Sequence, residues 1–269
     1  MSSARIEKYH YMFKMSVSKE MQYRANFLAG MVTSVIPMGM SVFMWKAVYQ
    51  EMDGAYGYNY TQIILYTILA AIISNLVSAD FASDIASDIK TGELNKFLSQ
   101  PIGYLMYRFL YYLGGKLISL SINGIMLIGV LCWFDRYTKV HIGLLNLIFF
   151  VVVTGLAILL NYAIFLIVGL TAFWLVDTFY LFWAINLIIL LASGGILPLE
   201  VYGTVGKVLF RFLPFQYTTY IPIHIILGTL SFSEMIQSIG IQLLWIGVLG
   251  YIAYYLWRKG IKNYVSVGG

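Results

Sequence analysis

The sequence predicts an all-α integral membrane protein with six transmembrane helices, and three observations support this fold class. Long apolar stretches, separated by short polar breaks, make up most of the 269 residues. The mean hydropathy is +0.80, and 60% of the residues are hydrophobic while only 11% are charged. A membrane-spanning helix needs about 20 apolar residues, and a soluble domain of this length could not bury so many. We therefore expect one transmembrane domain over residues 1–269.

Residues 1–25 are expected to form a helix in the membrane interface. Charges run through this segment, and no small-residue cleavage site follows a short apolar core, so it does not resemble a signal peptide. Its apolar residues recur at steps of three and four, while Lys8, Lys14 and Lys19 lie on the opposite face. This separation of faces is typical of a helix that lies in the plane of the membrane surface.

The six expected spans follow one another with short connections. They cover residues 27–49, 63–82, 106–133 and 142–170, a stretch that follows the connection at 171–177 and ends near 197, and residues 235–256. Lys and Arg collect on the cytoplasmic side of membrane proteins. With both termini inside, only Arg136, Lys139, Lys207 and Arg211 remain outside. We therefore expect both termini in the cytoplasm.

The polar segment 83–104 between the second and third spans is the richest in signals. Asp80, Asp84 and Asp88 recur every four residues and would share one helix face. This stripe fits a solvated acidic face or a surface for a basic partner better than a metal site, because no His assists it.

Thr91-Gly92-Glu93 should break the helix that carries this stripe, because glycine is a poor helix former. Beyond the break, Leu94, Phe97 and Leu98 are expected to form an exposed apolar ridge that docks to another protein.

Residues 198–233 are too short and too charged to cross the membrane, and we expect an external re-entrant hairpin. An apolar face formed by Val201, Val205, Val208, Leu209 and Phe212 opposes the charged pair Lys207 and Arg211. Irregular backbone at membrane depth is tolerated only where it is buried in protein or lines a cavity. The residues that mark this hairpin are Pro198, Glu200, Lys207, Arg211 and Pro214.

Several motifs are missing from the sequence. There is no Gly-x-x-x-x-Gly-Lys-Ser/Thr, so the chain is not expected to bind ATP itself. His-Glu-x-x-His and Gly-x-Ser-x-Gly are also absent, and the three histidines are scattered. We therefore expect no catalytic residue, no metal and no cofactor in this chain. The basic residues are explained by the membrane topology rather than by nucleic acid.

Two segments resemble ABC-2 type transporter permeases. Residues 88–98, Asp-Ile-Lys-Thr-Gly-Glu-Leu-Asn-Lys-Phe-Leu, followed by Pro101-Ile102, are similar to the first cytoplasmic loop of that family. Residues 193–200, Ser-Gly-Gly-Ile-Leu-Pro-Leu-Glu, followed by Leu213-Pro214-Phe215, are similar to the end of its fifth helix and its Leu-Pro-Phe segment. The closest subgroup has permeases encoded separately from the ATPase. At Tyr202-Gly203 the chain departs from the family, where a proline commonly stands.

The resemblance implies the transmembrane permease of an ATP-binding cassette exporter in the cell (plasma) membrane of a bacterium. The expected substrate is amphiphilic, such as a drug, a peptide or a lipid-like molecule. Two separate ATPase subunits would bind ATP and Mg, and a second permease, identical or paralogous, would complete the pore. The residues expected to couple to the ATPase are Asp84, Asp88, Thr91, Gly92, Glu93, Leu94, Phe97 and Leu98. Those expected along the substrate path are Tyr66, Asn75, Ser78, Phe182, Asn186 and Ser193.

Two other functions compete with this interpretation. A secondary transporter usually shows paired broken helices in two repeats, and the Gly-Pro break at 194–198 has no second copy. A membrane-embedded enzyme acting on lipids would need a cluster of catalytic side chains at one interface. The stripe of Asp80, Asp84 and Asp88 is the only candidate cluster, and it has no partner in the sequence.

Overall fold

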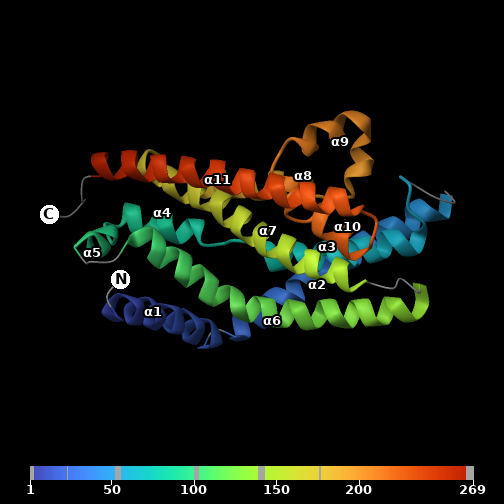
Figure 1. Ribbon diagram of the computed structural model, residues 1–269, viewed down its shortest axis with the longest axis horizontal. Helices are drawn as coiled ribbons and strands as arrows, with labels where there is room; N and C mark the ends of the chain where they lie inside the picture. Colours follow the sequence, from blue (N-terminus) through green and yellow to red (C-terminus); the bar gives the residue numbers. More distant parts are fainter. Residues whose placement is uncertain are drawn as a thin grey trace.

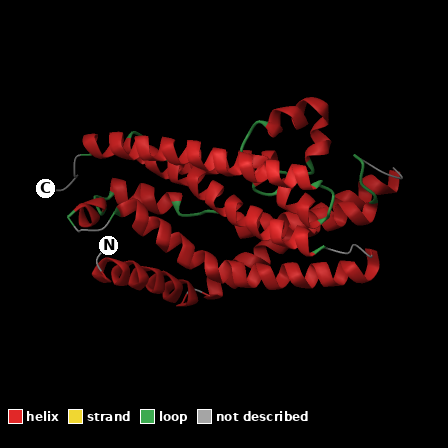
Figure 2. Ribbon diagram, viewed as in Figure 1, coloured by secondary structure: helices red, strands yellow, loops and turns green. Residues whose placement is uncertain are grey.

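The computed structural model describes residues 3–22, 24–51, 56–99, 103–138, 143–175 and 177–264. Within these ranges every regular element is a helix, as Figure 2 shows, so the all-α prediction is confirmed. The helices are α1 (Ser3–Gln22), α2 (Arg24–Glu51), α3 (Tyr60–Val77), α4 (Ala82–Lys90), α5 (Leu94–Leu98), α6 (Tyr104–Thr138), α7 (Leu144–Leu170), η1 (Thr171–Phe173), α8 (Phe179–Ala192), η2 (Leu199–Tyr202), α9 (Gly203–Arg211), η3 (Phe215–Tyr217), α10 (Tyr220–Ile226) and α11 (Phe232–Asn263).

The long helices α2, α3, α6, α7 and α11 run along the long axis of the molecule (Figure 1). The start of α1, the pair α4 and α5, and the end of α11 lie together at one end, on the left of that view. Helices α9 and α10 lie away from that end. The segment predicted to couple and the segment predicted to form the hairpin are thus separated along the axis.

Four helical stretches in the described part of the chain are long and apolar enough to cross a membrane. They are Tyr60–Lys90, Tyr104–Phe134, Leu144–Phe173 and Phe232–Lys262, while α8 is apolar but has only 14 residues. These lengths and compositions indicate a membrane protein. Six crossings stay a prediction.

The second predicted span ends earlier than expected, because a side chain from another helix stops α3. The amide nitrogen of Asn161 on α7 donates to the carbonyl of Val77 (2.8 Å), while the backbone N–H and the hydroxyl of Ser78 both donate to the carbonyl of Asn75. The chain then passes through residues 78–80 before α4 begins at Ala82. No glycine or proline marks this break.

Helix α8 also ends before the predicted residue 197. Its last residue is Ala192, and Gly194 follows with φ +78°, a conformation that side chains other than glycine rarely adopt. The carbonyl of Gly194 accepts a hydrogen bond from the Tyr66 hydroxyl of α3 (2.7 Å). A Cβ at Gly194 would lie 2.5 Å from that hydroxyl oxygen. The turn and the close contact both require glycine here.

Helix α7 is the centre of the packing, with contacts to α3, α4, α10 and α11. At its end, a Cβ on Gly169 would lie 3.0 Å from the Cβ of Ile85 and 3.1 Å from the carbonyl of Ala82. The missing side chain therefore lets α4 lie directly on α7.

Helix α1 packs on α6. The buried Ser16 donates to the carbonyl of Tyr111 (2.5 Å), and the Lys19 ammonium lies 5.2 Å from the centre of the Tyr111 ring. The segment predicted to lie in the interface is therefore a helix attached to the bundle.

Candidate functional site

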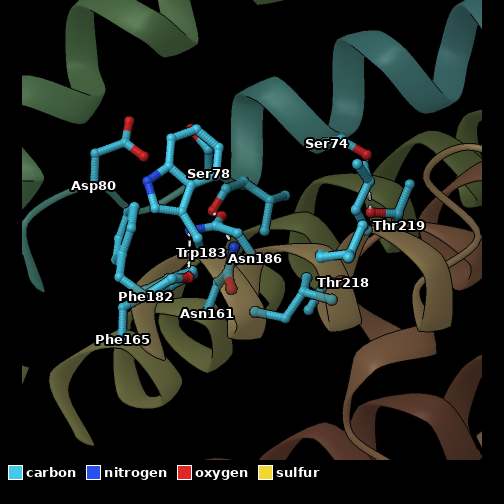
Figure 3. A pocket seen from close by; sticks show the side chains of 14 residues that line it. Ser74, Ser78, Asp80, Asn161, Phe165, Phe182, Trp183, Asn186, Thr218 and Thr219 are labelled. Carbon is cyan, nitrogen blue, oxygen red and sulfur yellow. Dashed lines mark hydrogen bonds between the residues drawn. The ribbon is translucent and has the colours of Figure 1, made fainter. Parts of the chain in front are cut away.

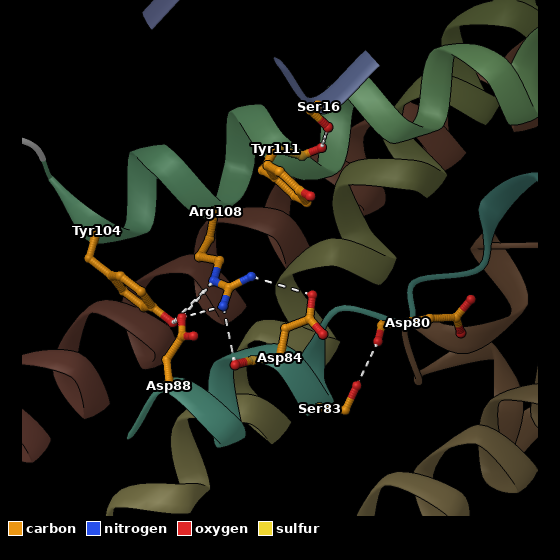
Figure 4. A network of polar contacts seen from close by, with 8 residues as sticks. All are labelled: Ser16, Asp80, Ser83, Asp84, Asp88, Tyr104, Arg108 and Tyr111. Atoms are coloured by element: carbon orange, nitrogen blue, oxygen red, sulfur yellow. Dashed lines mark hydrogen bonds and ion pairs between the residues drawn. The ribbon is translucent and has the colours of Figure 1, made fainter. Parts of the chain in front are cut away.

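Arg108 of α6 holds the segment that follows α3 (Figure 4). This residue is 8% exposed, and its Nε donates to Asp88 Oδ2 (3.0 Å). Its Nη2 also donates to Asp88 Oδ2 and to the carbonyl of Asp84 (3.2 Å), and its Nη1 lies 3.4 Å from Asp84 Oδ2. A single guanidinium thus ties two turns of α4 to α6.

Tyr104 extends this cluster to the last helix. Its hydroxyl donates to Asp88 Oδ2 (2.6 Å), and its ring stacks on Trp257 of α11 with centroids 5.2 Å apart and planes at 8°. The Phe97 ring of α5 meets the same tyrosine edge-on at 5.3 Å. The cluster formed by Asp84, Asp88, Tyr104 and Arg108, which we call the arginine cluster, therefore joins α4, α5, α6 and α11.

The prediction of a solvated acidic stripe is wrong in two respects. Asp88 is only 6% exposed and is paired with Arg108, whereas the Asp84 side chain is 54% exposed. Asp80 lies in the link 78–80 rather than on α4. The four-residue spacing predicts only which residues share a face of one helix. It cannot show that Arg108 of α6 packs on that face and buries Asp88.

The predicted apolar ridge is also corrected. Leu94 is fully buried, and Phe97 is partly covered by Tyr104 and by Tyr107, whose ring centre is 4.6 Å away. Of the three ridge residues only Leu98 is exposed. Phe97 therefore packs α5 against α6 through Tyr104 and Tyr107, and the buried Leu94 has no exposed surface to offer a partner.

The predicted break between the two short helices is confirmed. Gly92 has φ +82° and separates α4 from α5. The exposed tip of the pair consists of Thr91, Glu93, Lys96 and Leu98.

A cavity of about 420 Å³ lies beside α3, α7 and α8 (Figure 3). Three predicted path residues, Ser78, Phe182 and Asn186, line it. Phe165 and Trp183 add aromatic walls. The full lining comprises Ser74, Val77, Ser78, Asp80, Asn161, Phe165, Phe182, Trp183, Asn186, Leu187, Ile189, Leu190, Thr218 and Thr219.

The other three predicted path residues do not line this cavity. Tyr66 is fully buried and bonded to Gly194, and Ser193 is 1% exposed with its carbonyl accepting from the Tyr220 N–H (2.9 Å). The carbonyl of Asn75 accepts from Ser78 at the end of α3. In this structure the contacts of these residues hold helices and turns together.

Asn161 is a cavity residue that the sequence prediction missed. It is 4% exposed, and its amide nitrogen donates to Val77 as described above. Its carbonyl oxygen Oδ1 is buried and has no hydrogen-bond partner among the described residues. An amide in the middle of an apolar span is a sequence signal that could have identified it, because a polar group in lipid needs partners.

The segment predicted as an external hairpin carries a second polar cluster. Glu200 accepts hydrogen bonds from the hydroxyls of Tyr220 (2.5 Å) and Tyr58 (3.2 Å), and Tyr58 Oη lies 3.2 Å from His224 Nε2. We call these four residues the glutamate cluster. Burial, and then the neighbouring Glu200 carboxylate, raise the pKa of Tyr58 and of Tyr220 above the usual tyrosine value.

The remaining predicted hairpin residues lie along the segment that holds η2, α9 and η3. Pro198 and Pro214 directly precede η2 and η3, and Arg211 is exposed at the end of α9. The side chain of Lys207 lies outside the described residues. Four apolar side chains on α9 and at its end are exposed, namely Val205, Val208, Leu209 and Phe212.

Comparison with known protein families assigns the chain to one family. No curated protein matches it. The profile of a family described as "ABC-2 family transporter protein" matches residues 35–268, a range that contains the arginine cluster, the cavity and the glutamate cluster. Permeases of this family are membrane components that work with an ATP-binding subunit. The resemblance found in the two sequence segments is thereby confirmed, and the chain belongs to the ABC-2 family of transporters.

Proposed function

We propose that the chain is the transmembrane permease subunit of an ATP-binding cassette exporter and moves an amphiphilic substrate outward with ATP hydrolysed by separate subunits. The observation that carries this proposal is the fastening of α4 and α5. Their exposed tip lies at one end of the molecule, and the arginine cluster ties them to α6 and α11. A force applied at the tip would therefore reach two long helices.

Two ATPase subunits, which bind Mg and ATP, dock on such tips in the assembled transporter. The exposed Thr91, Glu93 and Leu98 form the contact, with Gly92 shaping the turn. The buried Asp88 and Leu94 transmit the movement instead of touching the partner. The proposal puts both termini in the cytoplasm, and it is supported by the start of α1 and the end of α11, which lie at the same end of the molecule as this tip.

The cavity forms part of the substrate path. Its wall is mostly apolar, with isolated hydroxyl and amide groups, which suits an amphiphile. The exposed apolar residues of α9 support a hairpin that dips into the outer leaflet and covers the path. A second permease, identical or paralogous, completes the pore, because a unit of this size has little room for such a path alone.

The test is recovery of the ATPase with tagged permease purified from native membranes. Glu93→Ala combined with Leu98→Ala removes two exposed contacts of the tip and should sharply reduce the copurifying subunit that carries Gly-x-x-x-x-Gly-Lys-Ser/Thr. The matched control is Val205→Ala with Ser233→Ala, two exposed positions away from the tip, and it should recover as much as the wild type. Equal recovery with all three proteins would refute docking at the tip, and no ATPase with any of them would refute the exporter.

A further inference from the structure

We propose that the glutamate cluster, together with Thr229, is a protonation site that holds η2 more tightly to α10 in a mildly acidic medium. This inference goes beyond the proposed transport function and does not depend on it. The proton is taken up by His224, which is 8% exposed. A cavity of about 610 Å³ lies beside this residue, and its lining includes Tyr58, Glu200, His224 and Thr229. The cluster therefore borders a space that water can enter.

Both ring nitrogens of His224 have hydrogen-bond partners. Nδ1 lies 2.7 Å from the hydroxyl oxygen of Thr229, and Nε2 lies 3.2 Å from the hydroxyl oxygen of Tyr58. The Tyr58 hydroxyl also donates to Glu200 Oε2 (3.2 Å). A tyrosine hydroxyl has a single proton, and a carboxylate is a stronger acceptor than a neutral ring nitrogen. Nε2 must therefore carry a proton of its own, and in the neutral ring Nδ1 accepts from Thr229.

The Thr229 hydroxyl allows Nδ1 to take up a proton without the loss of a hydrogen bond. Its oxygen lies 3.0 Å from the carbonyl oxygen of His224 as well as 2.7 Å from Nδ1. While Nδ1 is unprotonated, the hydroxyl donates to it. Once Nδ1 is protonated, the hydroxyl turns to the carbonyl and accepts from the ring. Thr229 is exposed, so a proton can pass from water through this hydroxyl.

Glu200 supplies the negative charge that compensates protonated His224. The Nε2–H group donates to Tyr58, and Tyr58 donates to Glu200, so one hydroxyl joins the two charges. The Tyr220 hydroxyl donates to the other carboxylate oxygen (2.5 Å). Two hydroxyl donors are the surroundings that favour an ionised carboxylate.

The other titratable groups that face His224 are tyrosines. The rings of Tyr58, Tyr66 and Tyr220 have their centroids 6.5, 6.1 and 4.1 Å from that of His224. Tyrosine has a usual pKa of about 10, so these hydroxyls stay neutral in mild acid. The elements α3, α7 and η3, which pack against α10, contain no Asp, Glu, Lys, Arg or His. Glu200 is therefore the charge to which His224 responds.

Protonation tightens the contact because the charged ring keeps both hydrogen bonds and gains an ionic partner. An opposite charge favours the charged form of a histidine, while burial opposes it. With the carboxylate two hydrogen bonds away, the folded chain holds the proton more firmly than the unfolded chain does. The resulting stability is complete below the unfolded value of about 6.5 and is lost as the pH rises through the higher folded value. Because Glu200 lies on η2, the gain strengthens the attachment of η2 to α10.

The test is a pH titration of the purified full-length chain with ¹⁵N-labelled histidine, followed by NMR. The signal that His224→Gln removes belongs to the cluster, and the exposed His10 of α1 is the internal reference. The neutral wild type should show the Nε2–H tautomer. The titration midpoint should fall by about one pH unit in Glu200→Gln, which removes the charge, and in Thr229→Val, which removes the acceptor of Nδ1–H. The matched control is Glu234→Gln, which removes a carboxylate from the cap of α11 and should leave the midpoint unchanged.

Thermal unfolding is the second measurement. The stability lost in Glu200→Gln should be larger at about pH 6 than at about pH 8.5, because only protonated His224 needs the carboxylate. An Nδ1–H tautomer in the neutral wild type, or an unchanged midpoint in Glu200→Gln, would overturn the proposal. Equal losses at the two pH values would refute the tighter attachment of η2. If Glu200→Gln does not fold, the wild-type tautomer and the midpoint of Thr229→Val still decide.

Discussion

The two ends of α3 are both held by polar side chains, but by different chemistry. After its last residue, the arginine cluster fastens the following α4 with a buried ion pair between Arg108 and Asp88. Before its first residue, the glutamate cluster joins Tyr58 to Glu200 and His224 through hydroxyl hydrogen bonds. The contacts after the last residue of α3 therefore depend on two opposite charges that compensate each other. The contacts before its first residue depend on tyrosine hydroxyls that donate to one carboxylate.

The difference concerns how each end responds to loss of a partner. A buried guanidinium deprived of its carboxylate keeps its charge, whereas a hydroxyl can rotate toward another acceptor. A buried ion pair is therefore strong only while both partners are present. Such a contact suits helices that must move together, as α4 and α6 would in the proposed transporter. The hydroxyl network suits an element that changes its contacts, as the proposed hairpin would.

The largest expected effect separates the two clusters directly. Asp88→Asn should destabilise the protein by up to about 3–5 kcal/mol, because it removes the buried carboxylate and leaves Arg108 with only the exposed Asp84, 3.4 Å away, as an ionic partner. Glu200→Gln should cost only about 1 kcal/mol, since its amide can still pair with tyrosine hydroxyls. Thermal unfolding in detergent measures both. Equal losses would show that charge is not what distinguishes the two ends.

A smaller effect is expected from alkaline pH and should arise at the glutamate cluster. The raised pKa of Tyr58 and Tyr220 means that the folded state keeps protons that the unfolded chain releases above about pH 10. Their contribution to stability is therefore present below pH 10 and is lost as the pH rises through the raised values. Unfolding followed from pH 8 to 11 should show this decline.

The double variant Tyr58→Phe with Tyr220→Phe is the control for the alkaline decline. Phenylalanine has no proton to release, so the decline should be shallower than in the wild type. A decline of the same steepness would assign the pH dependence to other groups.

The smallest effect is expected at the first turn of α3. The Asn59 side chain accepts from the Gln62 N–H (2.9 Å), and the Gln62 side chain accepts from the Asn59 N–H (3.0 Å), which together form a capping box. Asn59→Ala should cost about 1 kcal/mol. Asn59→Ser, which keeps a capping oxygen, should recover most of it in the same unfolding measurement. No difference between the two variants would show that the cap does not stabilise α3.

The success of the sequence predictions varied with the kind of signal. The Gly92 break between α4 and α5 was predicted correctly, because a glycine break is a property of a few neighbouring residues. The end of α3 at Val77 was not predicted, because the Asn161 side chain that stops it comes from α7. Likewise Ser78 was assigned to the path and lines the cavity, while Tyr66 of α3, assigned to the same path, is buried against Gly194.

The sequence by itself determined the membrane class, the helical character and the family, because all three follow from apolar composition and short local motifs. Only the tertiary structure decided which polar groups are buried together. Asp88 and Arg108 are 20 residues apart, and Glu200 and Tyr58 are 142 apart. Local periodicity cannot place such pairs, because helix packing brings them into contact and burial then makes each group depend on its partner.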